Sequence, residues 1–438
     1  MNVHFIAIGG SAMHNLAIAL FKKGYHVTGS DDEIFEPSKS RLKKYGIFPE
    51  NEGWFPEKID KHLDSVIVGM HARADNPELL AAQELGLKIY SYPEYLYEQA
   101  KDKKRVVIGG SHGKTTITSM ILHVLNFYKK PCDYMVGAQL EGFEVMVKMT
   151  DEAPVMVLEG DEYLTSPIDR RPKFHLYKPD IALISGIAWD HINVFPSYEN
   201  YIEQFEIFAD LISHNGTLIY CAEDKEVKKI GEAARNDVKA IPYSIPPHEI
   251  EFGVTQVVFN NKLIPLKIFG EHNLMNMQGA LLVCNELGIS SKEFYNAIKS
   301  FKGASKRLEI VTKNESTLFF KDFAHAPSKL IATTRAVKNQ FPNRQLVACI
   351  ELHTFSSLSE KFLSHYKGCL DDADVAKVYF NPHAIQLKKL PPLKPEQVRQ
   401  AFENPEVEIY TDSKRLLEDL KQINWNDKNL LMMSSGNF

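Results

Sequence analysis

Apolar runs of strand length alternate with segments of helical periodicity along nearly the whole chain. The first pair, "VHFIAIGG" and "SAMHNLAIALFKKG", predicts a strand, a glycine turn and an amphipathic helix that ends at Gly24. "YHVTGSDD" is the next predicted strand and closes a strand–helix–strand unit. Because this alternation is typical of domains built on parallel sheets, we expect an α/β fold.

Two polar, charged segments interrupt the alternation. "AKDKKR" precedes a new strand, "VVIGG", and "KGASKR" follows two helical patterns, "EHNLMNMQGALLVCNELG" and "SKEFYNAIKSF". We place boundaries there and predict three domains, at residues 1–103, 104–302 and 303–438. The stretch from about 239 to 268 is richer in strands. In the last domain strands again alternate with helices, from "STLFFKDFAH" to "NLLMMSSG".

The composition narrows the class of protein. Of 438 residues, 44% are hydrophobic and 24% are charged, as in ordinary globular chains, and the net charge of −5 argues against nucleic-acid binding. No apolar run approaches the roughly 18 residues of a membrane helix, and the N-terminus does not resemble a signal peptide. Five cysteines without a C-x-x-C pair favour free thiols. We expect a cytoplasmic protein with small-molecule substrates and no membrane or nucleic-acid partner; the sequence leaves the oligomeric state open.

The main chemical motif is "GGSHGKTT", residues 109–116. It lies between a predicted strand and the predicted helix "TITSMILHVL", which is the context of a phosphate-binding loop. Loop amides can surround phosphate oxygens, Lys114 can neutralise a terminal phosphate, and the Thr115 hydroxyl can bind Mg²⁺. The usual pattern, G-x-x-x-x-G-K-[ST], would need a glycine where Ile108 stands. A glycine-rich turn with a chance Gly-Lys-Thr is the alternative.

Acidic clusters follow two further predicted strands. "VMVLEGDEY" carries Glu159, Asp161 and Glu162 after its apolar residues, and "ALISGIAWDH" ends in Asp190 and His191. Because the carboxyl ends of parallel strands meet at one edge of a sheet, both clusters should lie beside the loop. Carboxylates suit Mg²⁺, and a histidine can complete a second site. A solvated loop is the alternative for each cluster alone.

The N-terminal turn "AIGGSAMHNLA", with Asp31 after the second strand, is a less regular nucleotide motif. Its glycines can admit a pyrophosphate at a helix N-terminus, and Asp31 can bind ribose hydroxyls. However, Gly9 and Gly10 are adjacent, and Ala12 and Asn15 stand where a further glycine would be expected. A turn without a ligand and the turn of a nicotinamide dehydrogenase are the alternatives.

Two further groups of polar residues lie later in the chain. "FGEHNLMNMQGALL" contributes His272, Asn273 and Asn276. These side chains could contact a base edge, although Asn273 could simply cap a helix. "SKRLE" and "KDFAHAPSK" contribute Arg307, Asp322 and His325, with Pro327 expected as a first helical residue. An arginine can stabilise a transferring phosphoryl group, and ordinary surface residues are the alternative.

In order and spacing, "IGGSAM…GSD", "GSHGKTT", "EGDE", "WDH", "GEHNLMN", "KRLE" and "DFAHAP" resemble the UDP-N-acetylmuramoyl peptide ligases, the Mur ligase family. The resemblance spans essentially the whole chain. The family's loop reads G-T-x-G-K-T-T, so Gly110 takes the role of the upstream glycine and Ile108 is the buried end of a strand. The resemblance implies a Rossmann-like UDP-binding domain, a central P-loop ATPase-like domain and a C-terminal Rossmann-like α/β domain that binds the amine substrate and closes on ATP.

The resemblance also implies an ATP-dependent peptide ligase that forms an acyl phosphate on a muramyl carboxylate. ATP would be bound by Gly110, Ser111, His112, Gly113, Lys114, Thr115, Thr116, His272, Asn273, Asn276, Arg307, Asp322 and His325. The catalytic residues would be Lys114, Glu159, His191 and Arg307. Two Mg²⁺ ions would be held, one by Thr115 and Glu159 and the other by His191. UDP-N-acetylmuramate would be bound by Gly9, Gly10, Ser11, Asp31, His71 and Arg73.

Two branches of the family differ in the amine substrate. One joins L-alanine to UDP-N-acetylmuramate, and the other joins recycled L-alanyl-γ-D-glutamyl-meso-diaminopimelate to the same nucleotide. "GMHARADNPEL", "EGDEYLTSPIDRRPKFHLYKPD" and "MMSSGNF" resemble the second branch, so we expect the tripeptide and a role in peptidoglycan recycling. "ELHTFSS" departs from that branch, which carries a Pro-Arg-Ser run there. A non-catalytic sensor of ATP or a nucleotide sugar is a further alternative.

Overall fold

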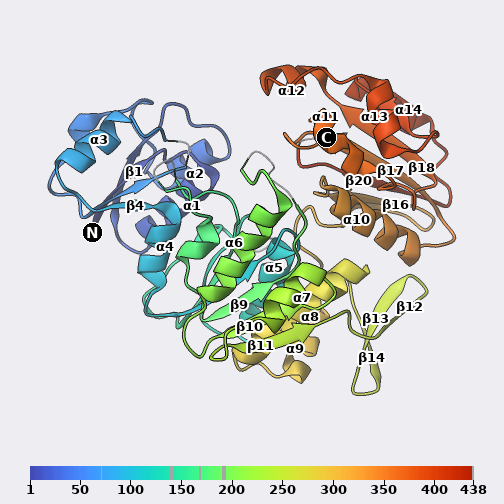
Figure 1. Ribbon diagram of the computed structural model, residues 1–438, viewed down its shortest axis with the longest axis horizontal. Helices are drawn as coiled ribbons and strands as arrows, with labels where there is room; N and C mark the ends of the chain where they lie inside the picture. Colours follow the sequence, from blue (N-terminus) through green and yellow to red (C-terminus); the bar gives the residue numbers. More distant parts are fainter. Residues whose placement is uncertain (71, 139–142, 167–168, 190–193, 437–438) are drawn as a thin grey trace. The chain divides into compact units, whose positions relative to one another are not determined.

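The fold is described from a computed structural model, which describes residues 1–70, 72–138, 143–166, 169–189 and 194–436. Strands and helices alternate along the described residues, where the strands form four sheets (Figure 1). Two compact units are present: residues 1–187, 198–243 and 279–289 in the first, and residues 188–197, 244–278 and 290–438 in the second. The expected α/β fold is confirmed. The domain boundaries near residues 103 and 303 stay predictions.

The first unit begins with a four-stranded sheet of order β2-β1-β3-β4, in which all pairs are parallel. Its strands are β1 (Asn2–Ile6), β2 (His26–Ser30), β3 (Ser65–Val68) and β4 (Ile89–Ser91), and its helices are α1 (Ser11–Lys22), α2 (Ser38–Lys44), α3 (Pro77–Glu84) and α4 (Tyr92–Ala100), with the short 3₁₀ helix η1 (Pro56–Lys58). The predicted strand–helix–strand unit is therefore present. The chain turns after α1 at Gly24, where a φ of +89° favours glycine.

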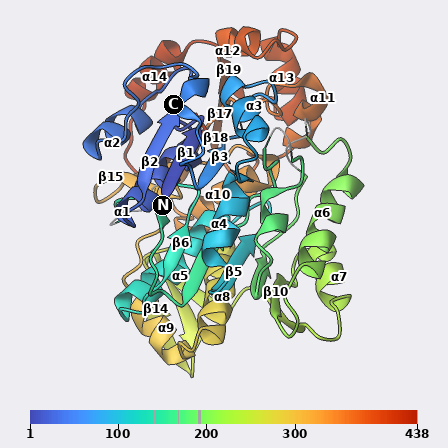
Figure 2. The same ribbon diagram turned by 90° about the vertical axis from the view of Figure 1, so that its left-hand side faces the viewer.

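The second sheet of this unit has the order β11-β10-β9-β5-β8-β6-β7 and is parallel except for the β6–β7 pair. Figure 2 labels its strands β5, β6 and β10. Its strands are β5 (Lys104–Gly109), β6 (Asp133–Met135), β7 (Val147–Lys148), β8 (Val155–Glu159), β9 (Ile181–Ile184), β10 (Thr217–Cys221) and β11 (Lys239–Tyr243). Helices α5 (Lys114–Phe127), α6 (Tyr198–Asp210) and α7 (Lys225–Glu232) and the 3₁₀ helix η2 (Lys173–Leu176) connect them. Strand β5 pairs with β8 and β9, and Ile108 is fully buried at its end, as expected.

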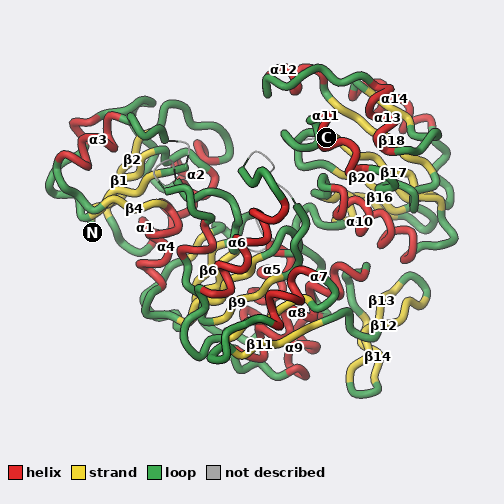
Figure 3. Tube along the Cα trace, in the orientation of Figure 1, coloured by secondary structure: helices red, strands yellow, loops and turns green. Residues whose placement is uncertain are grey.

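The second unit contains a small antiparallel sheet and a larger, mostly parallel one (Figure 3). The small sheet consists of β12 (His248–Glu251), β13 (Val254–Phe259) and β14 (Lys262–Pro265), which lie in the stretch expected to be rich in strands. The larger sheet has the order β15-β16-β20-β17-β18-β19, with strands β15 (Glu309–Lys313), β16 (Leu318–Asp322), β17 (Gln345–Leu352), β18 (Val375–Phe380), β19 (Glu408–Tyr410) and β20 (Lys428–Met433).

The remaining helices are α8 (Glu271–Glu286), α9 (Ser291–Ile298), α10 (Pro327–Gln340), α11 (Glu360–Leu363), η3 (Ser364–Tyr366), α12 (Pro382–Leu387), α13 (Pro395–Phe402) and α14 (Ser413–Gln422). Helix α10 begins at Pro327, as predicted from the sequence. A proline is suited to this position because its fixed φ is helical and its missing N–H would have no helical acceptor.

Polar contacts join α1 and α2 to the central sheet within the first unit. The backbone N–H of Met146, next to β7, donates to Asn15 Oδ1 at 3.1 Å. Glu144 accepts from Lys22 at 2.6 Å and from Lys44 at 3.0 Å. The side chain of Asn15, found where a nucleotide-binding turn would favour glycine, therefore fastens the N-terminal sheet to the central one.

An aromatic cluster holds α6 on the central sheet. The Phe174 ring stacks on Phe208 with 4.6 Å between centroids and meets the edge of Phe205 at 5.4 Å, and Tyr201 meets Phe205 at 5.3 Å. All four side chains are fully buried. The cluster fixes Tyr201, whose hydroxyl lies near the loop after β5.

The cysteines are free, as the sequence predicts. All five thiols are free; four are buried, and Cys132 is half-buried. Burial raises the pKa of Cys132 to about 11, so this thiol is protonated near neutral pH. Among the helices that the structure describes, none is long and apolar enough to cross a membrane.

Replacing Phe208 with alanine should destabilise the first unit by about 3–5 kcal/mol, because it empties a fully buried aromatic site. Urea unfolding followed by tryptophan fluorescence and circular dichroism measures the loss. Phe127→Ala is the matched control, since Phe127 is 46% exposed. Equal losses for the two variants would contradict the role given to the cluster.

Candidate functional site

The loop after β5 is a tight turn that needs glycine at two positions. Gly110 has a φ of +129°, and a Cβ on it would overlap Ser185 Oγ and lie 3.0 Å from the Ser185 nitrogen. Gly113 has a φ of +79° and immediately precedes α5. The Ser111 amide donates to the Gly186 carbonyl at 2.9 Å, and the His112 carbonyl accepts from the Ser185 hydroxyl. The loop therefore packs on the end of β9, and Gly110 has the role expected for the upstream glycine.

Lys114 begins α5 with its ammonium group turned back into the loop. Its Nζ donates to the Gly110 carbonyl at 2.6 Å and to Glu162 Oε2 at 2.5 Å. Burial by itself lowers the pKa of Lys114, but the nearby carboxylates of Glu162 and Asp161 outweigh it, and the pKa is raised. The side chain thus carries a positive charge at the place where a phosphate-binding loop needs one.

Thr115 and Glu159 supply the oxygen atoms of a candidate Mg²⁺ site. The Thr115 hydroxyl donates to Glu159 Oε1 at 2.8 Å, and the Gly137 amide donates to Oε2 at 2.7 Å. Burial raises the pKa of Glu159. A buried carboxylate beside a hydroxyl is a hard donor pair, which fits Mg²⁺. The acidic end of β8 therefore lies beside the loop, as expected.

The structure bears less on the further ligands of this Mg²⁺ and on the second predicted metal site. Among the described residues no group of three His, Cys, Asp or Glu side chains is placed to hold a metal ion. Phosphate oxygens and water could complete the coordination, as is usual for Mg²⁺. Asp190 and His191, expected to form the second site, lie outside the described residues. Thr116, the last residue of the motif, is 5% exposed in the first turn of α5.

The N-terminal turn is closed by its own acidic residue. The Gly9 amide donates to Asp31 Oδ2 at 2.7 Å, and a Cβ on Gly9 would lie 2.9 Å from that oxygen. Gly10 precedes α1, and Ser11 is its exposed first residue. Burial raises the pKa of Asp31 to about 6. Asp31 therefore supports the turn, and its remaining lone pairs could bind ribose hydroxyls.

Arg73 and His71 are the other two residues that the sequence assigned to the nucleotide sugar. Arg73 is highly exposed and makes a two-pronged contact with Asp75, with both N–O distances at 3.0 Å. His71 lies outside the described residues. Their contribution to a nucleotide site stays a prediction.

In the second unit the structure brings Arg307, Asp322 and His325 together. The Arg307 guanidinium lies over the Phe323 ring at 4.7 Å, and the His325 ring meets the same ring edge-on at 5.3 Å. The Asp322 carboxylate accepts from the backbone amides of Leu308 and Ala324, each at 2.7 Å. Asp322 thus fixes the segment that follows Arg307 against the end of β16.

The alternative interpretation of Asn273 as a helix cap is wrong. Helix α8 begins at Glu271, and Nδ2 of the Asn273 side chain donates back to the Phe269 carbonyl at 2.9 Å. Burial lowers the pKa of His272 to about 4, so its imidazole is neutral near pH 7. Asn276 is 8% exposed. These residues belong to the second unit, and their contact with the nucleotide stays a prediction.

Tyr201 is a site residue that sequence reasoning missed. Its hydroxyl donates to Glu162 Oε1 at 3.1 Å and lies 2.8 Å from Ser111 Oγ. It stands in an amphipathic helix about 40 residues beyond the acidic strand end, where an aromatic residue is expected merely to pack. Its contacts with Glu162 and Ser111 distinguish it, and no local pattern in the sequence predicts them.

Two family models match this chain. The model described as "Mur ligase family, catalytic domain" matches residues 2–104, and the "Mur ligase middle domain" matches residues 108–284. The UDP-N-acetylmuramate–L-alanine ligase of Endomicrobium trichonymphae is 30% identical over 86% of this chain and 84% of its own length. The enzyme of the same name from Carboxydothermus hydrogenoformans is 28% identical over 99% of this chain and 94% of its own length.

Solved structures share the fold along the whole chain. A UDP-N-acetylmuramate–alanine ligase from Thermotoga maritima has a TM-score of 0.71 at 22% identity, covering 100% of this chain and 96% of that one. A murein peptide ligase from Psychrobacter arcticus has a TM-score of 0.66 at 22% identity, with the same coverage. These likenesses concern the fold, which they share with the present chain.

Replacing Gly110 with alanine should weaken ATP binding on the order of 100-fold, because the loop must move away from Ser185 to accept a Cβ. Isothermal titration calorimetry with a non-hydrolysable ATP analogue measures the effect. Gly186→Ala is the matched control, since a Cβ there makes only an ordinary 3.5 Å contact with Asp224. Unchanged binding by Gly110→Ala would refute the assignment of the loop.

Proposed function

This chain belongs to the Mur ligase family, and we propose that it joins the carboxyl group of UDP-N-acetylmuramate to the amino group of an L-alanyl substrate. It is an ATP-dependent ligase that forms a carbon–nitrogen bond and uses Mg²⁺. The observation that carries the proposal is the convergence of Lys114, Thr115 and Glu159 at one sheet edge. A sensor without catalysis is the alternative, and it would have no need of the second metal site that the resemblance assigns to His191.

Free L-alanine is the first candidate for the amine. Its support is the name shared by curated relatives that align with most of the chain at 28–30% identity. These relatives favour L-alanine over the tripeptide that the sequence motifs led us to expect. The bond formed would be the same with either amine, because both present the amino group of an L-alanine residue.

The tripeptide L-alanyl-γ-D-glutamyl-meso-diaminopimelate is the second candidate. Its support is the segment after "EGDE", which resembles the tripeptide branch and folds back on itself. The amide of Thr165 donates to the Arg171 carbonyl at 3.0 Å, and Lys173 donates likewise to the Tyr163 carbonyl at 3.0 Å. Asp169 pairs with Arg171 at 2.6 Å. Residues 167 and 168 of this segment lie outside the described residues.

The chemistry explains why a cation and a metal site are needed. A carboxylate resists attack by an amine, because its negative charge is delocalised around the carbon atom. Transfer of the γ-phosphoryl group of ATP to a carboxylate oxygen breaks the bond to ADP and gives an acyl phosphate. The amine nitrogen then attacks the carbonyl carbon, and phosphate leaves as the amide forms and the amine loses a proton. Phosphoryl transfer depends mainly on positioning and charge neutralisation.

Each group would have a defined role in this reaction. Lys114 would neutralise the terminal phosphates, and Thr115 and Glu159 would hold Mg²⁺, which supplies further neutralisation of charge.

The first domain, through Gly9, Gly10, Ser11 and Asp31, would bind UDP. Arg307, Asp322 and His325 would contact ATP from the C-terminal domain, with His272, Asn273 and Asn276 near the base. His191 would serve a second Mg²⁺.

Replacing Lys114 with alanine should lower kcat/KM by about 100-fold or more, because the transferring phosphoryl group loses its neutralising charge. Phosphate release and product formation measure turnover, and calorimetry should show unchanged binding of UDP-N-acetylmuramate. Lys130→Ala, at an exposed position after α5, is the control. Full turnover by Lys114→Ala would refute this assignment.

The amine substrate is decided by measuring ATP consumption with L-alanine and with the tripeptide in parallel. On the support of the relatives, we expect kcat/KM for L-alanine to exceed that for the tripeptide. A preference for the tripeptide would make the second candidate correct and assign the enzyme to recycling. If neither amine supported ATP consumption, the proposed function would be refuted.

A further inference from the structure

A buried chain of hydrogen bonds lies behind the loop lysine. Glu162 Oε2 accepts from Lys114 at 2.5 Å, and the two side chains are 2% and 14% exposed respectively. Glu162 follows the acidic end of β8 but is not one of the oxygen donors assigned to Mg²⁺. The proposed reaction therefore leaves Glu162 without a role, although it is the carboxylate nearest to the cation.

The direction of the protons in this chain follows from the donors available. The Tyr201 hydroxyl has one proton, which it donates to Glu162 Oε1 at 3.1 Å. The 2.8 Å hydrogen bond between Tyr201 and Ser111 must then be donated by the Ser111 hydroxyl. A continuous path of donors thus runs from Ser111 in the loop through Tyr201 to Glu162. With both carboxylate oxygens engaged, Glu162 has one preferred position.

The electrostatics of this arrangement oppose nucleotide binding. A carboxylate beside a phosphate site repels the phosphates and neutralises part of the lysine charge. A lysine side chain has many rotamers, however, and holding its ammonium in one place removes the cost of ordering it when the phosphates arrive. The observed geometry favours orientation of the lysine at the expense of its attraction for the nucleotide.

We propose that Glu162 is a positioning residue for phosphoryl transfer, which holds Lys114 in the orientation that meets the terminal phosphate and is itself fixed by Tyr201 and Ser111. This inference rests on the proposed function, since it takes Lys114 to act on ATP. Tyr201 acts through Glu162 and touches no reacting atom. The helix α6 is thereby a support of the loop, because the aromatic cluster holds Tyr201 in place.

The test is the effect of Glu162→Gln on kcat and on nucleotide affinity separately. The amide keeps the shape of the side chain and an oxygen for Tyr201, but it removes the negative charge that holds Lys114. We expect kcat to fall by about 10-fold to 100-fold. The Kd for a non-hydrolysable ATP analogue should stay unchanged or decrease, because the relief of phosphate repulsion offsets the restored cost of ordering Lys114. A merely structural defect would weaken both kcat and affinity.

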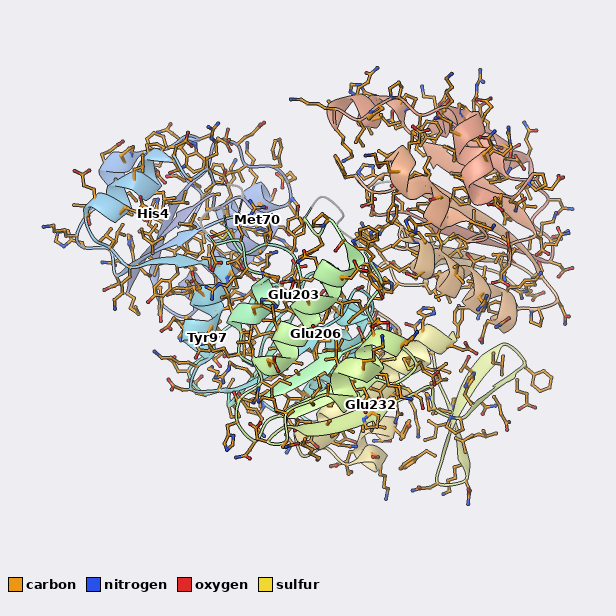
Figure 4. All side chains as sticks on the ribbon, in the orientation of Figure 1. His4, Met70, Tyr97, Glu203, Glu206 and Glu232 are labelled. Atoms are coloured by element: carbon orange, nitrogen blue, oxygen red, sulfur yellow. The ribbon has the colours of Figure 1, made fainter. Side chains whose placement is uncertain are left out.

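A second variant and a control complete the experiment. Tyr201→Phe should lower kcat in the same pattern but less, and the double variant should lose less than the product of the two separate effects. If Glu162→Gln does not fold, the same split between kcat and Kd is read from Tyr201→Phe. Glu203→Gln, an exposed position on α6 labelled in Figure 4, makes the same charge change and should leave both quantities unaltered.

The inference is overturned if Glu162→Gln leaves kcat unchanged, or if it weakens analogue binding in proportion to kcat. Independent, multiplicative effects of the two substitutions would also overturn it. Failure of the proposed function is recognised separately, because the wild-type protein would then consume no ATP with either L-alanine or the tripeptide.

Discussion

The parallel pairing of β5 with β8 and β9 is the constraint on which the proposed site depends. Because the three strands run in one direction, β5 ends in the loop, β8 ends in Glu159, and β9 leads to Ser185 against Gly110. Burying a carboxylate costs free energy unless hydrogen bonds compensate it. Here Thr115 and Gly137 supply two of them, and a bound cation would offset the remaining charge.

The contacts of the first unit explain how two substrates could be aligned. The N-terminal turn and the loop belong to one compact unit, in which Asn15 and Glu144 fasten α1 to the central sheet. Phosphoryl transfer demands that a carboxylate and a phosphate be held close together, and this fixed junction would serve that need if the turn and the loop bind the two substrates as proposed. Arg307 and its neighbours belong to the other unit, and their contact with ATP stays a prediction.

Several site interactions join residues far apart in the sequence, which limits what motifs can predict. The loop and the acidic strand end could be recognised because each motif is local: a strand, glycines and a helix in the first, and an apolar run followed by carboxylates in the second. Asn273 shows the opposite case. Its type and position suggested a helix cap, but the helix begins earlier and the side chain bonds the preceding turn.

The sequence by itself determined the α/β fold, the glycine turn after β5 with Gly110 in place of the missing glycine, and the family. These features follow from periodicity and from residue types at fixed short spacings. Only the tertiary structure decided that Glu162 accepts a hydrogen bond from Lys114 and another from Tyr201. It also decided that Asn15 joins the N-terminal sheet to the central sheet. These contacts span 39 to 131 residues, and side chains so distant become partners only through the packing of the sheets and helices that carry them.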